Sequence, residues 1–250
     1  MSLWYEHKTV IDTRDVDGCS RCRPSALLGH LQEAATLAAE HGNFGRKVLM
    51  DGYGAFWMLA RLWYELKRPL RWGEELTVHT WHRGGKGASM YRDFDLYVKD
   101  EYVGQAVSMW ALVSLTERKM LRLSQIPELE GTGGGERNKD ILLSNLRLPE
   151  PMELAERRLM HYSDTDINDH VNNTRYADFA CDALRMDKLS GERYLAEMQI
   201  GYLAECQAGE VLDICSGEYE DGRTYICGND EEGKSRFEVL MLFRDGNKEN

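Results

Sequence analysis

Residues 164–176 have the sequence DTDINDHVNNTRY, in which acidic, amide and imidazole side chains recur at every second position. The polar residues at these positions are Asp164, Asp166, Asn168 and His170. If the segment is extended, side chains two positions apart point to the same side, so all four line one wall. A carboxylate, an amide and an imidazole together can polarise a carbonyl group and transfer a proton near neutral pH. We therefore expect a catalytic segment here, with a polar surface loop as the simpler alternative.

The residues after His170 predict a helix. Asn172 and Asn173 are of the type favoured at a helix N-cap. Apolar residues then recur at helical spacing: Tyr176, Phe179, Ala180, Ala183 and Leu184. The spacing predicts a helix over residues 173–186. Free N–H groups at a helix start can bind a developing oxyanion, so Asn172 and Asn173 are candidate substrate-binding residues.

Further segments form an ordered pattern with this motif. Residues 201–206 have the sequence GYLAEC, which places Glu205 next to Cys206. Segments in the first half are 58–61 (MLAR), 69–74 (PLRWGE), 78–81 (VHTW) and 118–127 (RKMLRLSQIP). The ordered set resembles the acyl-acyl-carrier-protein thioesterases, the fatty-acid-releasing hydrolases of plants and bacteria. The His-Val-Asn-Asn segment alone is less specific, because small acyl-CoA thioesterases share it.

The resemblance implies a fold, an activity and a partner. The implied fold is α+β: a tandem, or double, hotdog, in which each unit is a curved antiparallel β-sheet wrapped around a long central helix. The implied activity is hydrolysis of the thioester of fatty acyl-acyl-carrier protein, which releases free fatty acid and ends chain elongation. The implied partner is acyl carrier protein carrying a fatty acyl chain. An acyl-CoA thioesterase of the same fold is the alternative.

Two residues compete for the chemical step. We expect Glu205 to activate water for attack on the thioester, with His170 orienting or relaying the proton. Asn168 would stabilise the oxyanion, and Asp166 would orient His170 or Asn168. The alternative makes Cys206 a nucleophile activated by His170. The charge of Glu205 disfavours a neighbouring thiolate. If the two residues lie in a regular strand, they also face opposite ways, so the sequence favours Glu205.

The two halves of the chain repeat one another. An offset of 149 residues pairs Asp17 with Asp166, and residues 52–55 with residues 201–204. In this register, the residues matched to Asn168, His170, Glu205 and Cys206 are Cys19, Arg21, Phe56 and Trp57. We therefore expect catalysis in the second repeat and an acyl-chain pocket in the first. The candidate pocket residues, for which core packing is the alternative, are Tyr53, Phe56, Trp57 and Met58.

Composition shifts suggest an N-terminal domain over 1–129, a linker over 130–150 and a catalytic C-terminal domain over 151–250, because residues 130–140 are rich in glycine and polar residues. Pro24 is suited to the first position of a helix. The apolar residues after it continue to Ala39. The expected strands are 76–81, 89–98, 103–115, 157–162, 198–203, 211–217, 224–227 and 237–243.

Composition also bears on partners and location. The chain has 250 residues and a formal net charge of −11, which argues against nucleic acid as a partner. No apolar run reaches the roughly 18 residues of a membrane span. No secretory signal is evident, and six cysteines in a chain of this length do not suggest a disulfide framework, so we expect a cytoplasmic protein. An acidic carrier protein would need a local basic patch. The candidates are Arg61, Lys67, Arg68 and Arg71; Arg157 and Arg158; and Lys86.

We expect neither a cofactor nor a metal ion. Residues 228–235 fit the phosphate-loop pattern GxxxxGKS, but three acidic residues within them would repel phosphate. Cys19 and Cys22 lack a second ligand pair at zinc-binding spacing. A non-hydrolytic acyl-ligand-binding protein is a further alternative, although it would not need the four catalytic candidates together. The chain is also a candidate to form a homodimer.

Overall fold

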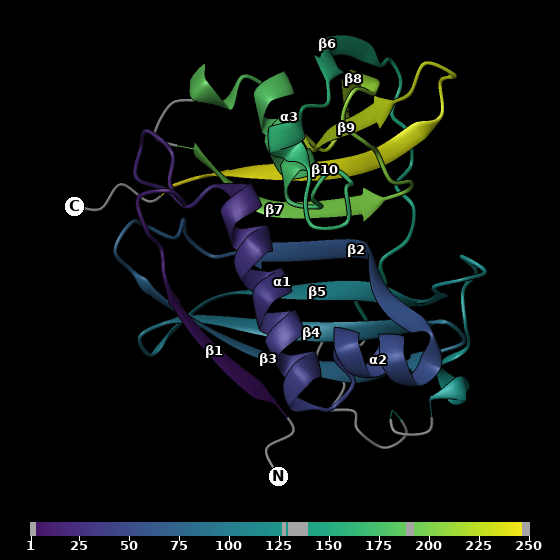
Figure 1. Cartoon of the computed structure of the whole chain (residues 1–250). Helices are drawn as coiled ribbons and strands as arrows, with labels where there is room; N and C mark the ends of the chain where they lie inside the picture. Colours follow the sequence, from purple (N-terminus) through teal and green to yellow (C-terminus); the bar gives the residue numbers. More distant parts are fainter. Residues whose placement is uncertain (1–3, 127–128, 130–139, 189–192, 247–250) are drawn as a thin grey trace. The chain divides into compact units, whose positions relative to one another are not determined.

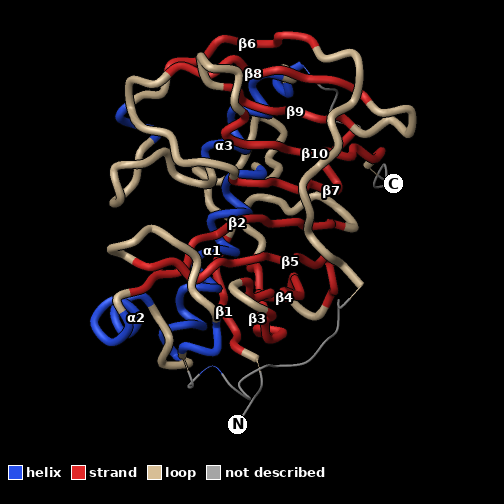
Figure 2. Tube along the Cα trace, turned by 90° about the vertical axis from the view of Figure 1, so that its right-hand side faces the viewer, coloured by secondary structure: helices blue, strands red, loops and turns tan. Residues whose placement is uncertain are grey.

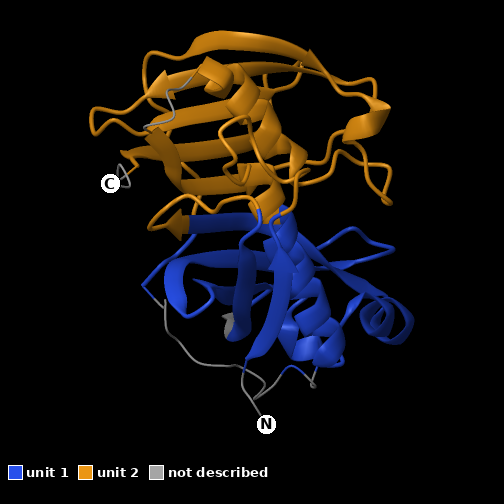
Figure 3. Cartoon of the chain, turned by 90° about the vertical axis from the view of Figure 1, so that its left-hand side faces the viewer, with its two compact units in different colours: residues 1–11, 29–64, 73–143 blue, residues 12–28, 65–72, 144–250 orange. Residues whose placement is uncertain are grey.

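The computed structural model describes residues 4–126, 129, 140–188 and 193–246, without the side chains of residues 84–86. The chain divides into two compact units (Figure 3). Unit 1 contains residues 1–11, 29–64 and 73–143, and unit 2 contains residues 12–28, 65–72 and 144–250. Each unit is thus assembled from several segments, and the boundaries expected at 129 and 150 stay a prediction. The glycine-rich part of the expected linker, 130–139, lies outside the described residues.

Unit 1 combines a sheet with two helices (Figure 1). Its strands are β1 (Tyr5–Val10), β2 (Ala55–Leu66), β3 (Glu75–Lys86), β4 (Ser89–Val98) and β5 (Glu101–Ser114). Its helices are α1 (Pro24–His41), whose first five residues belong to unit 2, and α2 (Arg46–Tyr53). The strand order is β1-β3-β4-β5-β2, and the antiparallel register places Phe94 opposite both Thr80 and Ala106.

The core of unit 1 lies between α1 and its sheet. Leu31, Ala34, Ala35 and Ala38 recur at helical spacing and are all buried, as is Phe94 on β4. This confirms the apolar helix expected from Pro24.

Helix α2 was not expected from the sequence. It is capped by Gly54, whose φ of 56° costs glycine less than other residues, and whose N–H donates to the Met50 carbonyl at 3.2 Å. The chain then enters β2 directly, at Ala55.

Unit 2 is also a helix packed on an antiparallel sheet. Its strands are β6 (Glu153–Leu159), β7 (Arg193–Tyr202), β8 (Val211–Glu218), β9 (Thr224–Asn229) and β10 (Ser235–Asp245), and its main helix is α3 (Arg175–Ala183). The order is β7-β10-β9-β8-β6, and all four neighbouring pairs are antiparallel. Phe179 of α3 and Phe237 of β10 are fully buried. Short 3₁₀ turns lie at Leu123–Gln125, Tyr162–Asp164 and Met186–Lys188.

The described part of the expected linker contacts the sheet of unit 2. The Leu146 N–H donates to the Glu238 carboxylate at 3.0 Å, and the Gln199 side chain donates to the Ser144 carbonyl at 3.0 Å. The hydroxyl of Tyr219 donates to the Arg147 carbonyl. In Figure 2 this segment is the long tan loop that passes beside the strands of unit 2. Residues 144–147 are therefore held by side chains of the sheet.

Several sequence-based bounds are corrected. The strand expected at 157–162 is β6 at Glu153–Leu159, because the chain turns at residues 162–164. Strand β7 begins at Arg193 instead of 198, and helix α3 covers Arg175–Ala183 instead of 173–186. Strands β1 and β2 had no counterpart among the expected elements. Strand β4 has the expected bounds.

Candidate active site

The motif segment forms a closed turn in unit 2, and the extended wall expected from its alternating pattern is wrong. The Asp166 N–H donates to the His170 carbonyl at 2.9 Å, and the Asp169 N–H donates to the Asp166 carbonyl at 3.0 Å. The Asp166 carboxylate accepts the Asn168 N–H at 2.8 Å. Asp169 has a φ of 59°, a left-handed conformation that Asp tolerates better than most residues. Aspartate side chains readily bond the backbone two residues on, which favours a turn over a strand.

Asp164 is buried and stabilises this turn, and does not line the candidate active site with the other polar residues of the motif. Its side chain is 3% exposed and binds the guanidinium of Arg175 at 3.1 Å. Its other oxygen accepts the His161 N–H at 2.8 Å. Its carbonyl accepts the Asn172 N–H at 2.8 Å. Asp164 therefore connects both ends of the motif loop to the start of α3.

The side chains of His170 and Glu205 meet. His170 Nε2 lies 3.4 Å from Glu205 Oε2, and the two side chains are 24% and 43% exposed. The Val171 N–H donates to the Cys206 carbonyl at 2.8 Å, which fixes one loop against the other. Arg236 donates to the Glu205 carbonyl at 2.9 Å. An imidazole and a carboxylate at this separation, both open to solvent, can bind and deprotonate a water molecule.

Cys206 has a different environment from its neighbour. Both residues follow the end of β7 at Tyr202, so they lie in a loop. The Cys206 side chain is nevertheless fully buried, while Glu205 is exposed. Burial raises the pKa of the Cys206 thiol. The thiolate needed for a nucleophile is therefore disfavoured at neutral pH.

The start of α3 lies beyond the two asparagines. The helix begins at Arg175, two residues later than expected, and Thr174 in the N-cap position makes no side-chain cap hydrogen bond. The Asn172 side chain instead accepts both the N–H and the hydroxyl of Thr174, at 2.9 and 2.8 Å. The Asn172 carbonyl accepts the Arg175 N–H at 2.9 Å. The N–H groups of Thr174 and Arg175 are therefore already bonded within the turn. Oxyanion binding by Asn168 and substrate binding by Asn172 and Asn173 stay predictions.

Unit 1 contains a small cavity of about 160 Å³. Phe56 and Trp57 line it, together with alanines of α1 and the side chains of Met90 and Trp110. Arg92 also lines it, and burial lowers the pKa of the Arg92 guanidinium to about 10. Two of the four expected pocket residues are therefore placed at a cavity. Tyr53 packs instead against the cluster of Leu49, Ala55, Leu112 and Ile126, and Met58 is not among the described lining residues.

The repeat inferred from the sequence is confirmed by hydrogen bonds. In the first repeat the Asp17 N–H donates to the Arg21 carbonyl at 2.8 Å, and the Ser20 N–H to the Asp17 carbonyl at 3.0 Å. The Asp17 carboxylate accepts the Cys19 N–H at 2.8 Å. Ser20 has the same φ, 59°, as Asp169. Loop 12–23 is thus a backbone copy of loop 161–172, with Arg21 in the place of His170.

The pairing of Glu205 with Phe56 is corrected by the same bonds. The Cys22 N–H donates to the Leu70 carbonyl at 2.8 Å, as the Val171 N–H does to that of Cys206. The Gly73 and Gly209 N–H groups likewise bond equivalent carbonyls, those of Ile11 and Met160. The offset therefore falls from 149 to 136 after the helix, because the first repeat includes extra residues such as α2. The counterparts of Glu205 and Cys206 are Pro69 and Leu70.

Two further observations concern the described residues alone. No helix among them is both long enough and apolar enough to cross a membrane. No group of three or more His, Cys, Asp or Glu side chains among them is arranged to hold a metal ion.

Comparison with protein families agrees with these features. The model of the acyl-ACP thioesterase N-terminal domain matches residues 2–128, and that of the C-terminal domain matches residues 153–245. The chain belongs to the acyl-ACP thioesterase family. Among curated relatives, dodecanoyl-[acyl-carrier-protein] hydrolase of Cinnamomum camphora is 26% identical over 202 residues, 75% of this chain. Oleoyl-acyl carrier protein thioesterase of Coriandrum sativum is 22% identical over 245 residues, 90% of this chain. The chain spans 52% and 65% of the lengths of these two chloroplastic relatives.

Solved structures of acyl-ACP thioesterases show the same fold. That from Bacteroides thetaiotaomicron superposes with a TM-score of 0.82 at 22% identity, covering 97% of this chain and 98% of the other. The 12:0-ACP thioesterase from Umbellularia californica superposes with a TM-score of 0.80 at 18% identity, covering 98% of each chain. This member of the family is therefore a double hotdog of the α+β class, as the resemblance implied.

Proposed function

We propose that this acyl-ACP thioesterase homologue hydrolyses the thioester of fatty acyl-acyl-carrier protein and so releases a free fatty acid. The observation that carries the proposal is the pairing of His170 with Glu205 at 3.4 Å, in a chain that belongs to this family. The first repeat has Arg21 in the place of His170 and Pro69 in the place of Glu205. Because it lacks both the imidazole and the carboxylate, we infer one catalytic site, in the second repeat. Acyl-CoA hydrolysis is the second candidate, since thioester chemistry is the same for either thiol.

In the mechanism we infer, Glu205 accepts a proton from a water molecule, whose oxygen attacks the thioester carbonyl. His170, in contact with Glu205, orients that water and carries the proton toward the sulfur as the carbon–sulfur bond breaks. Asn168 donates a hydrogen bond to the oxyanion of the tetrahedral intermediate. Asp166 is a positioning residue, because its backbone and carboxylate bonds hold His170 and Asn168 in the turn. A donor of this kind contributes ~3 kcal/mol to transition-state binding.

Direct comparison of donors tests the proposal. The purified chain would be incubated with acyl-carrier protein and acyl-CoA thioesters of matched lengths, and thiol release measured for each. We expect the larger kcat/KM with the carrier protein as donor. A preference for acyl-CoA would make the second candidate the function. Binding of acyl ligands without thiol release from any thioester would favour the non-hydrolytic alternative.

We infer that the cavity of unit 1 receives the acyl chain. Its lining is mainly apolar and aromatic, as is common in pockets for aliphatic ligands. Phe56 and Trp57 restrict its volume. Each additional CH₂ group that a substrate buries contributes ~0.8 kcal/mol, so the depth of the cavity selects chain length.

Phe56→Ala and Trp57→Ala are each expected to shift the preferred substrate toward longer acyl chains, because truncation of a lining ring enlarges the cavity. The measurement is kcat/KM over a series of acyl chain lengths. Met58→Ala is the matched control, since this neighbour on β2 is not among the described lining residues. An unchanged profile in both aromatic variants, or an equal shift in the control, would remove the cavity from the acyl site.

Carrier docking is expected to depend on a local basic group, because the net charge of −11 opposes approach of an acidic protein. Arg157 lies 3.6 Å from both Asp213 and Glu231, and Arg158 binds Asp182 at 3.0 Å. Their charges are thus matched locally. In the group of Arg61, Lys67, Arg68 and Arg71, the side chains of Lys67 and Arg71 are exposed, so this group is tested first. The side chain of Lys86 lies outside the described residues.

Lys67→Glu combined with Arg71→Glu is expected to raise KM for acyl-carrier protein at least fivefold, because both exposed side chains then repel an acidic partner. Hydrolysis of a short uncharged thioester should be unchanged. The matched control is Arg157→Glu combined with Arg158→Glu. Equal loss on both substrates would indicate damage to the fold, and a larger KM effect in the control would move the docking site to that group.

Two properties stay predictions beside this function. A reducing compartment such as the cytoplasm is favoured by six cysteines that are all free. A homodimer is tested by sedimentation equilibrium of the purified chain.

A further inference from the structure

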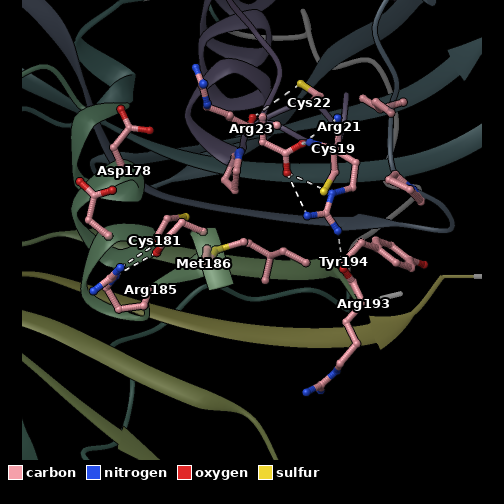
Figure 4. A pocket seen from close by; sticks show the side chains of 18 of the residues that line it. Cys19, Arg21, Cys22, Arg23, Asp178, Cys181, Arg185, Met186, Arg193 and Tyr194 are labelled. Carbon is pink, nitrogen blue, oxygen red and sulfur yellow. Dashed lines mark hydrogen bonds and ion pairs between the residues drawn. The ribbon is translucent and has the colours of Figure 1, made fainter. Parts of the chain in front are cut away.

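A second, larger cavity lies within unit 2, beside the first-repeat copy of the catalytic loop. Its volume is about 890 Å³, within the range of ~300–1,000 Å³ typical of small-molecule sites. Figure 4 shows Cys19, Arg21 and Arg23 on one side of this cavity, with Asp178 and Cys181 of α3 across from them. The described lining residues include none of the catalytic candidates.

The loop beside this cavity keeps the backbone of a catalytic loop without its chemistry. Arg21 replaces the imidazole of His170, Cys19 replaces Asn168, and Pro69 replaces Glu205, as the repeated hydrogen bonds establish. Asp17 is retained, but it binds Arg21 at 3.0 Å. A guanidinium cannot act as a general base at neutral pH. The site is therefore suited to binding and not to hydrolysis.

The charges around the cavity favour an anion. Four lining arginines are ion-paired with carboxylates that also line it: Arg21 with Asp17, Arg158 with Asp182, Arg175 with Asp178, and Arg185 with Asp187. Arg23 differs from these four. Its side chain is exposed and donates to the Arg14 carbonyl at 3.2 Å, and the carboxylate it acts on electrostatically is that of Asp178. The nearby Asp178 is held by Arg175 at 2.6 Å, so its charge is already matched.

Two further charged side chains line the cavity, Glu156, which lies 3.5 Å from Arg158, and Arg193, which lies 3.9 Å from Asp245. The aliphatic part of the lining comes from Leu66, Leu70, Met186 and Leu195. A cavity whose arginines outnumber its carboxylates, with aliphatic side chains beside them, matches an amphiphile with one small anionic head. A long-chain carboxylate has this chemistry.

We propose that this cavity binds a free fatty acid, with the carboxylate at Arg23 and the alkyl chain along the aliphatic lining. The choice of a fatty acid rests on the proposed function, because that reaction releases one. The site is separate from the catalytic loop and holds the product class without transforming it.

Cys19 provides a readout that is independent of catalysis. Its side chain is exposed and lines the cavity, so a bound chain should shield it from alkylation. The intact chain would be treated with iodoacetamide at increasing laurate concentration, and modification of each cysteine measured by mass spectrometry. We expect Cys19 to react at least fivefold more slowly at saturating laurate. Cys215 on β8 does not line the cavity and should react at an unchanged rate.

A pair of variants identifies the contact. Arg23→Gln should raise the laurate concentration that gives half-protection at least tenfold. Arg157→Gln, an exposed arginine of the same unit outside the cavity, should leave it unchanged. Equal protection by dodecanol, which has no carboxylate, would contradict the role assigned to Arg23. Absence of protection at the solubility limit of laurate would overturn the proposal.

The result is distinguishable from a failure of the proposed function. His170→Ala should keep full protection of Cys19, because catalysis is not involved. A chain that hydrolyses acyl thioesters but shows no protection refutes only this cavity assignment. If laurate protects Cys19 but the chain releases no thiol from acyl thioesters, only the proposed function is refuted.

Discussion

Replacing Glu205 by glutamine is expected to lower kcat for thioester hydrolysis at least a hundredfold without unfolding the protein. The amide cannot accept the proton of the attacking water, and a hundredfold loss corresponds to ~2.7 kcal/mol of transition-state stabilisation. Because the Glu205 side chain is 43% exposed, its replacement should cost little stability. His170→Ala should cause a similar loss, since it removes the partner of Glu205. The measurement is kcat on acyl-carrier protein, with the melting temperature followed in parallel.

Two further variants make this result specific. Glu231→Gln removes another exposed carboxylate of unit 2, one that pairs with Arg157, and should leave kcat unchanged. Cys206→Ala should retain most of the activity, although loss of a fully buried thiol will lower stability. Near-normal hydrolysis by Glu205→Gln, together with an acyl group trapped on Cys206, would reverse the assignment and make the cysteine the nucleophile.

Asp164→Ala is expected to lower the free energy of unfolding by about 3 kcal/mol, because it breaks a buried ion pair. The change removes the bonds to Arg175 and to the His161 N–H, and leaves the Arg175 guanidinium paired with Asp178. Breaking a buried pair costs about 3–5 kcal/mol, and the 36% exposure of Arg175 places this case at the lower end. Urea unfolding measures the effect.

Ser163→Ala is the matched control, since this exposed neighbour lies in the same 3₁₀ turn. It should change the free energy of unfolding by less than about 0.5 kcal/mol. Asp164→Ala should also reduce kcat at temperatures where the protein is folded, because the loop that carries His170 is attached through Asp164. Stability and kcat both close to wild type would show that the loop does not depend on this ion pair.

The elements that the sequence predicted well are those whose pattern has one physical explanation. Pro24 followed by apolar residues at helical spacing can form little else but a helix, and α1 has the expected start. The bounds of β4 were also correct, because a segment that contains Tyr91, Phe94 and Tyr97 lies there between turns at residues 87–88 and 99–100. Helix α2 was not predicted, because its eight residues are too few for helical periodicity of apolar residues to distinguish it from a loop.

The candidate site was predicted in its residues but not in its geometry. Alternating Asp and Asn residues suggested an extended strand, yet these side chains bond their own backbone, and the Asp166 carboxylate closes a turn. Asp164 was placed on the same wall, although it is the buried support of the loop. The contact between His170 and Glu205 joins residues far apart in sequence, so periodicity could not reveal it. The resemblance brought these two residues together, and the fold brings their side chains within 3.4 Å.

The composition of the two units has a consequence for dissecting this chain. Unit 2 includes residues 12–28 and 65–72, although the rest of this unit begins only at residue 144. Expression of residues 151–250 alone would therefore omit part of the unit that holds His170 and Glu205. No single cut in the polypeptide releases both units whole. A recombination or domain exchange with one breakpoint therefore divides at least one of the two units.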